Sequence, residues 1–177
     1  MSRSGYIEDD GEDTLAHGRW RGAVASAIRG KNGQAFLKEL LAALEAMPRK
    51  ELISQELKVE GQFCALGVLG DKRGVPLESL DPEDYEAVAS AFQINEKIVQ
   101  EIVYLNDEHC DDWMRVEVEI CGPMRPWSPD WGKHTKTYRA PDPDAPARRW
   151  AYMRDWVAKQ IKDADGVRDT CGGKNNG

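Results

Sequence analysis

Most of the chain places apolar residues three and four positions apart, the spacing that forms one face of an α-helix. The clearest example is residues 32–48, where a stripe of large apolar side chains ends just before Pro48. The stripe consists of Phe36, Leu37, Leu40, Leu41, Leu44 and Met47. Residues 19–30 show the same spacing and end at Gly30, so they predict a helix immediately before this one.

Further helices are predicted along the middle of the chain. Residues 62–74 are small and apolar and include three glycines, which favours a helix that a neighbour approaches closely. Residues 80–109 predict two consecutive helices. We expect Asp81 to cap the first, with Pro82 at its first position, and Asn95 to cap the second. The second helix should bury Ile98, Ile102, Val103 and Leu105 and end in a turn at Asn106 and Asp107.

Three other segments complete the helical part. Residues 50–61 predict a short helix followed by a turn or a short strand. Residues 140–146 contain three prolines and predict a stiff linker. Residues 147–164 predict the last helix, and its buried face should hold Trp150, Met153, Val157 and Ile161.

The helical spacing stops at residues 115–121, where Val116 and Val118 alternate with charged residues. This period of two indicates a β-strand, and a weaker strand pattern occurs in residues 134–139. Prolines and glycines between the two strands require a loop. The fold predicted is mainly α, a helical bundle of about six or seven helices with one inserted, long-looped β-hairpin, or flap, at residues 114–140.

The length of 177 residues suffices for one domain with its own core, which we assign to residues 15–164. Residues 1–14 hold five acidic side chains and predict a mobile tail, and residues 165–177 predict a frayed end. No apolar run approaches the roughly 20 residues that cross a membrane. Because the N-terminus is acidic and polar, we expect no secretory signal and an intracellular location.

The net charge of −7 bears on partners more than on fold. It argues against non-specific nucleic-acid binding, which requires several lysines or arginines facing phosphates. It permits binding to a protein with a basic surface, and the acidic residues Glu8, Asp9 and Asp10 of the tail are candidate contacts. Acidic charge also serves solubility alone, so the observation leaves both interpretations open.

The flap carries the strongest candidate contact residues: Met124, Arg125, Trp127 and Trp131. Aromatic, methionine and arginine side chains concentrate binding energy at interfaces, and neighbouring prolines reduce the entropy lost on binding. The alternative is that Trp127 and Trp131 fold back as a lid and plug the bundle. The sequence does not choose between a recognition flap and a lid.

Residues with catalytic or metal-binding chemistry are few. Cys64 is a candidate nucleophile at a helix start, but its apolar neighbours favour a core position. Four soft ligands near the flap, His109, Cys110, Cys121 and His134, are a candidate zinc set. Their spacing differs from the usual pairs of zinc ligands, and no phosphate-loop, dinucleotide or metalloprotease motif occurs. We therefore expect no cofactor, no metal and no enzymatic activity.

Residues 88–102 have the outline of a helix-turn-helix. A DNA-reading second helix presents basic or amide side chains to phosphates and bases. Here the second helix offers Glu96 and Glu101 beside Lys97 and Gln100. Direct nucleic-acid binding is therefore an alternative and not the leading hypothesis.

Four stretches together resemble small proteins encoded by phages and prophages of proteobacteria: residues 63–75, 88–94, 101–107 and 148–161. The resemblance covers most of residues 19–108 and 147–161, and the flap departs from the shorter members. It implies an accessory protein of a mobile element acting in a bacterial cytoplasm, where such proteins often bind and inhibit host machinery. The leading hypothesis is thus an inhibitor, of the anti-CRISPR kind, that occupies a basic site on a host protein.

Overall fold

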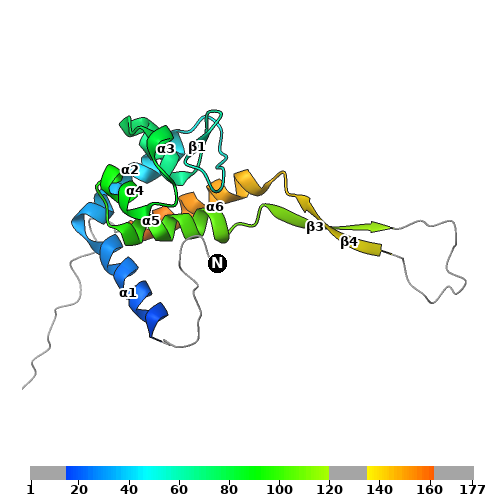
Figure 1. Ribbon diagram of the computed structural model, residues 1–177, viewed down its shortest axis with the longest axis horizontal. Helices are drawn as coiled ribbons and strands as arrows, with labels where there is room; N and C mark the ends of the chain where they lie inside the picture. The colour runs from blue at the N-terminus through cyan, green and yellow to red at the C-terminus, as the bar shows by residue number, and fades with distance from the viewer. Residues whose placement is uncertain (1–14, 120–134, 162–177) are drawn as a thin grey trace, which may run out of the picture.

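The computed structural model describes residues 15–119 and 135–161, and it shows a helical bundle from which one long hairpin projects (Figure 1). The described residues form six α-helices: α1 (Ala16–Arg29), α2 (Lys31–Ala46), α3 (Ala65–Arg73), α4 (Tyr85–Phe92), α5 (Glu96–Val103) and α6 (Ala145–Gln160). The hairpin consists of β3 (Trp113–Glu119) and β4 (Thr135–Pro141). The predicted fold class, a mainly α bundle with one inserted hairpin, is confirmed.

Helix α2 lies at the centre of the core and packs against α1, α3 and α6. The predicted stripe is confirmed, because Phe36, Leu37, Leu40 and Leu44 are at most 1% exposed. Leu41 and Met47 are half-buried at the edge of the same face. Burial of these side chains, each of which contributes about 1.5–3 kcal/mol, is what holds α2 in place.

Helix α3 confirms the predicted close approach of a neighbour. A Cβ atom at Gly67 would lie 1.8 Å from the Leu57 carbonyl oxygen, and one at Gly70 would lie 2.6 Å from Leu77. At Gly67 only hydrogen fits, because the neighbouring atom is a backbone oxygen, whereas at Gly70 the side chains of Leu77 and Phe92 would have to shift. The glycines therefore allow the chain around Leu57 and the short 3-10 helix Leu77–Ser79 to pack directly against α3.

The start of α4 corrects the prediction, whereas the start of α5 confirms it. Helix α4 begins at Tyr85, and the Ala87 N–H donates to Asp84 Oδ1 at 2.9 Å, so Asp84 and not Asp81 is the cap. Asp81 instead accepts from the Glu83 N–H at 2.9 Å and forms a turn before the helix. At α5, the Lys97 N–H donates to Asn95 Oδ1 at 2.9 Å, as expected for a capping asparagine.

Residues 50–61 form no helix, contrary to the prediction, although the short strand is present. The chain is irregular here, with bends at Ser54, Gln55 and Leu57, and then forms the two-residue strands β1 (Lys58–Val59) and β2 (Gln62–Phe63). Its backbone groups bond to distant segments: the Leu52 N–H donates to Pro146 O at 3.1 Å, and the Ile53 N–H donates to Phe63 O at 3.0 Å. These long-range bonds replace the helical ones.

Helix α6 starts earlier than predicted, because Ala145 and Pro146 belong to it and not to a linker. Proline is well tolerated in a first helical turn, where its missing N–H has no partner to lose. Met153 and Val157 are buried as predicted, and Trp150 and Ile161 are half-buried. Helix α6 ends at Gln160, and residues 162–164 of the predicted helix lie outside the described residues.

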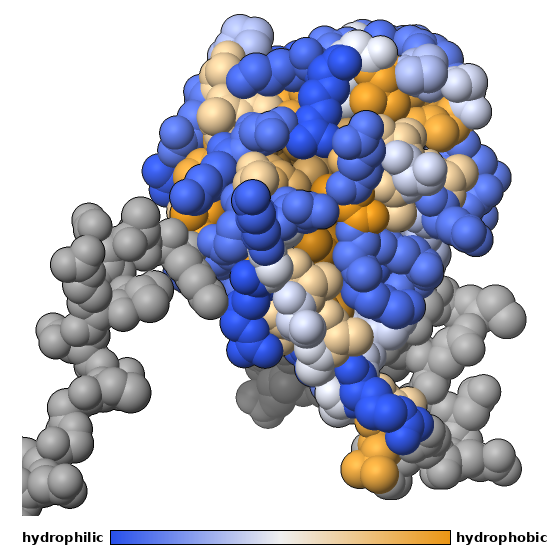
Figure 2. All heavy atoms as spheres, turned by 90° about the vertical axis from the view of Figure 1, so that its left-hand side faces the viewer, coloured by the Kyte–Doolittle hydropathy of each residue, from blue (hydrophilic) through white to orange (hydrophobic). Residues whose placement is uncertain are grey.

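Strands β3 and β4 pair antiparallel, with Trp113 opposite Pro141 at the base and Glu119 opposite Thr135 at the far end. We call this pair of strands the arm. The arm extends away from the helices (Figure 1). The face of the bundle on the α1 side is mainly hydrophilic, with small apolar areas between polar ones (Figure 2). None of the described helices combines the length and the apolar character that crossing a membrane requires.

Candidate functional site: the β3–β4 arm and its anchor

The exposed apolar surface of the described residues is concentrated on the arm. The described residues include six exposed large apolar side chains, and four of them belong to the arm: Trp113, Met114, Val118 and Tyr138, each 42–47% exposed. The other two, Leu15 and Val59, lie on separate parts of the bundle. Single exposed apolar residues are ordinary, whereas a group of them on one element indicates a contact surface.

The strand register divides the arm into two faces, because residues opposite one another and residues two apart share a face. One face is mainly apolar and contains the pairs Met114–Ala140, Val116–Tyr138 and Val118–Lys136. The Lys136 Nζ lies 5.5 Å from the centre of the Tyr138 ring, so a positive charge borders this apolar face.

The opposite face is more polar and contains the pairs Trp113–Pro141, Arg115–Arg139 and Glu117–Thr137. The Arg139 guanidinium lies 5.4 Å from the centre of the Trp113 ring and 3.4 Å from Asp111. A cation over an aromatic ring at an exposed site contributes about 0.5–1 kcal/mol. Trp113 and Arg139 thus form a small, ordered pair at the base of the arm.

The arm has no covering layer among the described residues, where its sheet consists of β3 and β4 alone. A two-stranded hairpin without packing on either face is at best marginally stable in water. Its outer edges also present backbone groups that another chain can bind. These properties are typical of an element that is completed by a partner.

Charge also separates the arm from the rest of the chain. Residues 113–141 contain five lysine or arginine residues and three acidic residues, a net charge of +2. Because the whole chain carries −7, the remaining residues carry −9. The net negative charge of the chain therefore comes entirely from residues outside 113–141, which the total charge alone does not reveal.

Arg149 of α6 anchors the base of the arm to the bundle. Its side chain is 1% exposed, and its Nε and Nη1 donate to Asn106 O at 2.6 Å and Leu52 O at 2.8 Å. Its Nη2 pairs with the carboxylate of Asp112, the residue directly before β3. One arginine thus connects the arm, the helix that follows it and the irregular segment around Leu52.

Asp112 extends this anchor to both sides of the hairpin. Its second carboxylate oxygen accepts from Ser54 Oγ at 2.6 Å, and its carbonyl accepts from the Asp142 N–H at 2.8 Å. Asp142 follows β4 and in turn pairs with Arg148 at 2.7 Å. The bond with Arg148 lowers the pKa of the Asp142 carboxyl group below its usual range. The arm therefore leaves the bundle from a fixed base.

Asn106 belongs to the same network, although its position predicted only a terminal turn of a helix. The chain continues beyond α5 as a wider π-type turn, Tyr104–Glu108, and Asn106 within it is 2% exposed. Its Nδ2 donates to Ile53 O at 2.9 Å, and its Oδ1 accepts from the Ala65 N–H at 3.3 Å. Asn106 therefore joins the irregular segment around Ile53 to the start of α3.

The candidate zinc ligands are only half within the described residues, because Cys121 and His134 lie outside them. His109 is exposed and stacks on Tyr152, with 4.2 Å between the ring centres. Cys110 is buried, and burial raises the pKa of its thiol. No cluster of three or more potential ligands occurs in residues 15–119 and 135–161.

Cys64 occupies the core position that its neighbours predicted. It is 7% exposed at the start of α3, and its Sγ accepts from the Gly67 N–H at 3.3 Å. The sulfur thus caps the helix. This arrangement explains a cysteine at the position by packing and capping.

Helix α5 offers no exposed face for reading DNA. All residues from Ile98 to Val103 are buried, because α1 packs against this helix. Glu101 accepts from Arg21 Nη1 at 2.9 Å, so the polar side chain of a would-be recognition helix is engaged inside the protein. A recognition helix must instead present several side chains to the groove.

The chain matches no protein-family model, no curated protein and no solved structure. The candidate site is therefore defined by geometry alone. The resemblance to phage-encoded proteins stays a prediction.

The predicted contact residues all lie outside the described residues: Met124, Arg125, Trp127 and Trp131 in 120–134, and Glu8, Asp9 and Asp10 in 1–14. Sequence reasoning located the hairpin but missed the contact candidates on its strands, such as Trp113 and Tyr138. The sequence could have indicated them, because a single hairpin in a helical chain has two faces and few other elements to cover them. Apolar residues on its strands are therefore expected to be exposed. Sequence reasoning also missed Arg149, which stands four residues before Met153 on the buried stripe of α6.

Proposed function

We propose that this chain acts by binding another protein and not by catalysis, with the arm as its main contact element. The observation that carries this proposal is the concentration of exposed apolar side chains on an element that the bundle does not cover. The anchored base adds to it, since a contact element held in one orientation loses less entropy on binding.

The size of the arm is compatible with this role. An aromatic side chain buries about 150–250 Å² in a contact, and a standard interface buries about 800 Å² on each partner. Trp113, Tyr138 and the apolar strip provide part of that area, and the predicted contacts Trp127 and Trp131 would extend it. A few such anchors commonly supply most of the binding energy.

The partner that we propose is a host protein with a basic surface. The charge of −9 outside the arm favours such a partner, and electrostatic attraction would guide the encounter before the arm engages. The biological setting that we propose, a phage or prophage accessory protein acting on bacterial defence in the cytoplasm, rests on the sequence resemblance alone.

Capture from a bacterial lysate with matched variants tests the proposal. The arm variant Met114→Thr/Val118→Thr keeps strand propensity but removes apolar surface at two positions that are 42% and 45% exposed. Its control, Leu15→Thr/Val59→Thr, makes the same kind of change at the two exposed positions of the bundle. We expect the wild type and the control to capture the same protein and the arm variant to lose it.

Two results would contradict the proposal. One is equal capture by the arm variant and the control. The other is loss of capture by both variants, which would indicate that exposed apolar residues of the bundle contribute to capture as much as those of the arm. A duplex titration tests the alternative of a nucleic-acid-binding regulator, because such binding weakens steeply with salt, whereas we expect no binding at any salt concentration.

A further inference from the structure

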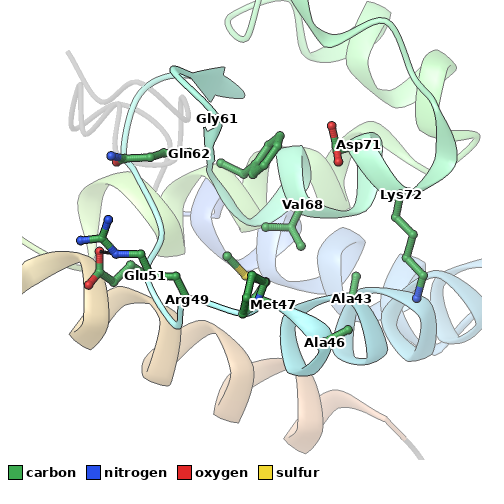
Figure 3. Close-up of a pocket in the computed structure, with 12 residues that line it drawn as sticks. Ala43, Ala46, Met47, Arg49, Glu51, Gly61, Gln62, Val68, Asp71 and Lys72 are labelled. Carbon is green, nitrogen blue, oxygen red and sulfur yellow. Dashed lines mark ion pairs between the residues drawn. The ribbon is translucent and has the colours of Figure 1, made fainter.

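A half-open pocket of about 280 Å³ lies between α2 and α3, and none of its lining residues belongs to the arm (Figure 3). The pocket exists because small side chains face one another across the two helices. Ala43 and Ala46 line it from the last turn of α2, and Val68 lines it from α3. Pro48 then directs the chain away from the helix, so no part of the chain that the structure describes fills the space above these residues.

The floor of the pocket is apolar. Val68 points into the space between the helices and Met47 lies below it (Figure 3). Phe63 of β2 also lines the pocket. Val68 is 8% exposed, and Phe63 and Met47 are half-buried. An apolar chain that enters here would cover surface that water contacts in the free protein, and this favours binding.

The charged groups are arranged asymmetrically around this floor. Arg49 and Glu51 pair with each other at 2.7 Å at one end, whereas Lys72 reaches from α3 toward α2 at the other (Figure 3). Asp71 points away from α2 and pairs with Lys58 at 3.6 Å. The side chain of Lys72 makes no ion pair or hydrogen bond with the described residues, so it is the lining cation that remains available to a ligand.

We propose that this pocket binds a small amphipathic carboxylate, such as a short fatty acid. Its hydrocarbon chain would lie on Val68, Met47 and Phe63, and its carboxylate would pair with Lys72. The volume supports a short ligand, because pockets for drug-sized molecules begin at about 300 Å³. This site is additional to protein binding by the arm and does not depend on it.

Calorimetric titration with ligands that differ in one feature tests the proposal. Octanoate should bind about 15-fold more tightly than hexanoate, because each buried methylene contributes about fourfold. Octan-1-ol lacks the carboxylate and should bind up to about fivefold more weakly than octanoate, because an exposed ion pair contributes no more than about 1 kcal/mol. Octylammonium, which repels Lys72, should bind most weakly.

Variants locate the binding on the protein. Ala46→Phe fills the mouth of the pocket from an exposed position and should abolish octanoate binding, and Gln62→Trp is a second blocking variant if the first does not fold. Lys72→Met should reduce octanoate binding to the level of octanol. Lys38→Met, which removes the same charge elsewhere on α2, should leave binding unchanged.

Three results would overturn the proposal. The first is the absence of detectable binding at about 10 mM octanoate, because such small ligands should reach a dissociation constant in the millimolar range. The second is unchanged binding in the folded blocking variants, which would place the ligand elsewhere. The third is octylammonium binding as tightly as octanoate, which would exclude a carboxylate as the recognised group.

Discussion

The bundle and the arm differ in what covers their apolar residues. In the bundle, helices cover one another, and Leu37, Leu40 and Leu44 of α2 are completely buried. In the arm, Val118 and Tyr138 alternate with polar residues in the same orderly way, yet each stays nearly half exposed. A sheet face requires a second layer, and the described part of the chain supplies none.

This difference separates two properties that usually overlap in one core. Residues of the bundle determine whether the protein folds, whereas under the proposed function residues of the arm determine what it contacts. The network around Arg149 is the junction between them. Substitutions on the two sides of this junction should therefore change different measurements.

The largest loss of stability is expected at the junction. Arg149→Met leaves the carbonyls of Leu52 and Asn106 without their donor and should lower the free energy of unfolding by about 3–5 kcal/mol. Arg154→Met is the matched control, because Arg154 lies on the same helix but pairs with Glu45 at the surface. Its loss should stay below about 1 kcal/mol in a denaturant titration. Equal losses of unfolding free energy in the two variants would mean that Arg149 does not anchor the arm.

A similar contrast is expected between a bundle leucine and an arm valine. Leu40→Ala should cost about 2–5 kcal/mol, because Leu40 is fully buried and its truncation leaves a cavity. Val118→Ala on the arm should change the free energy of unfolding by no more than about 0.5 kcal/mol. If chemical denaturation gave a comparable loss for Val118→Ala, the arm would be packed in solution and the lid interpretation would gain support.

Two glycines of the bundle should respond in opposite ways to substitution by alanine. Gly67→Ala places a Cβ atom 1.8 Å from a backbone oxygen and should destabilise the protein by at least about 1–3 kcal/mol. Gly22→Ala in α1 meets no atom within 4 Å and should stabilise it by about 0.5–1 kcal/mol, because alanine favours a helix. Thermal unfolding distinguishes the two directly. A neutral Gly67→Ala would mean that α3 does not approach Leu57 so closely.

The smallest effect concerns pH at the base of the arm. The pKa of Asp142 is lowered in the folded protein, first by its bond with Arg148, so its ionised form favours folding. That contribution is complete above the unfolded pKa of about 3.9 and disappears as pH falls through the folded pKa. Asp142→Asn should therefore be slightly less stable than the wild type near pH 7, and this difference should shrink as the pH is lowered from about 3.9 toward about 2. A constant difference across this range would contradict the pairing.

The helices and the hairpin were predictable because their patterns are local. The stripe of α2, the cap at Asn95 and the alternation around Val118 each lie within one element and need no knowledge of the others. The start of α4 was predicted wrongly for a physical reason: an aspartate before a helix can cap it or form a turn, and Asp81 forms the turn while Asp84 is the cap.

The anchor could not be read from local patterns. Arg149 meets Leu52 across 97 positions of sequence, and Asn106 meets Ile53 across 53. These polar bonds hold residues 50–57 in an irregular conformation in place of the helix predicted there. The arm's role was likewise only half predictable, since alternation reveals a strand but not whether anything covers it.

One measurement tests the central claim most directly: capture of the partner by a chain whose residues 114–140 are replaced by a short Gly-Ser turn. The turn joins Trp113 to Pro141, which already face each other at the base of the arm. We expect this protein to melt within about 2–4 °C of the wild type, a shift of about 1 kcal/mol, and to capture no partner. Capture of the same partner by the armless protein, or collapse of its melting transition, would contradict the claim.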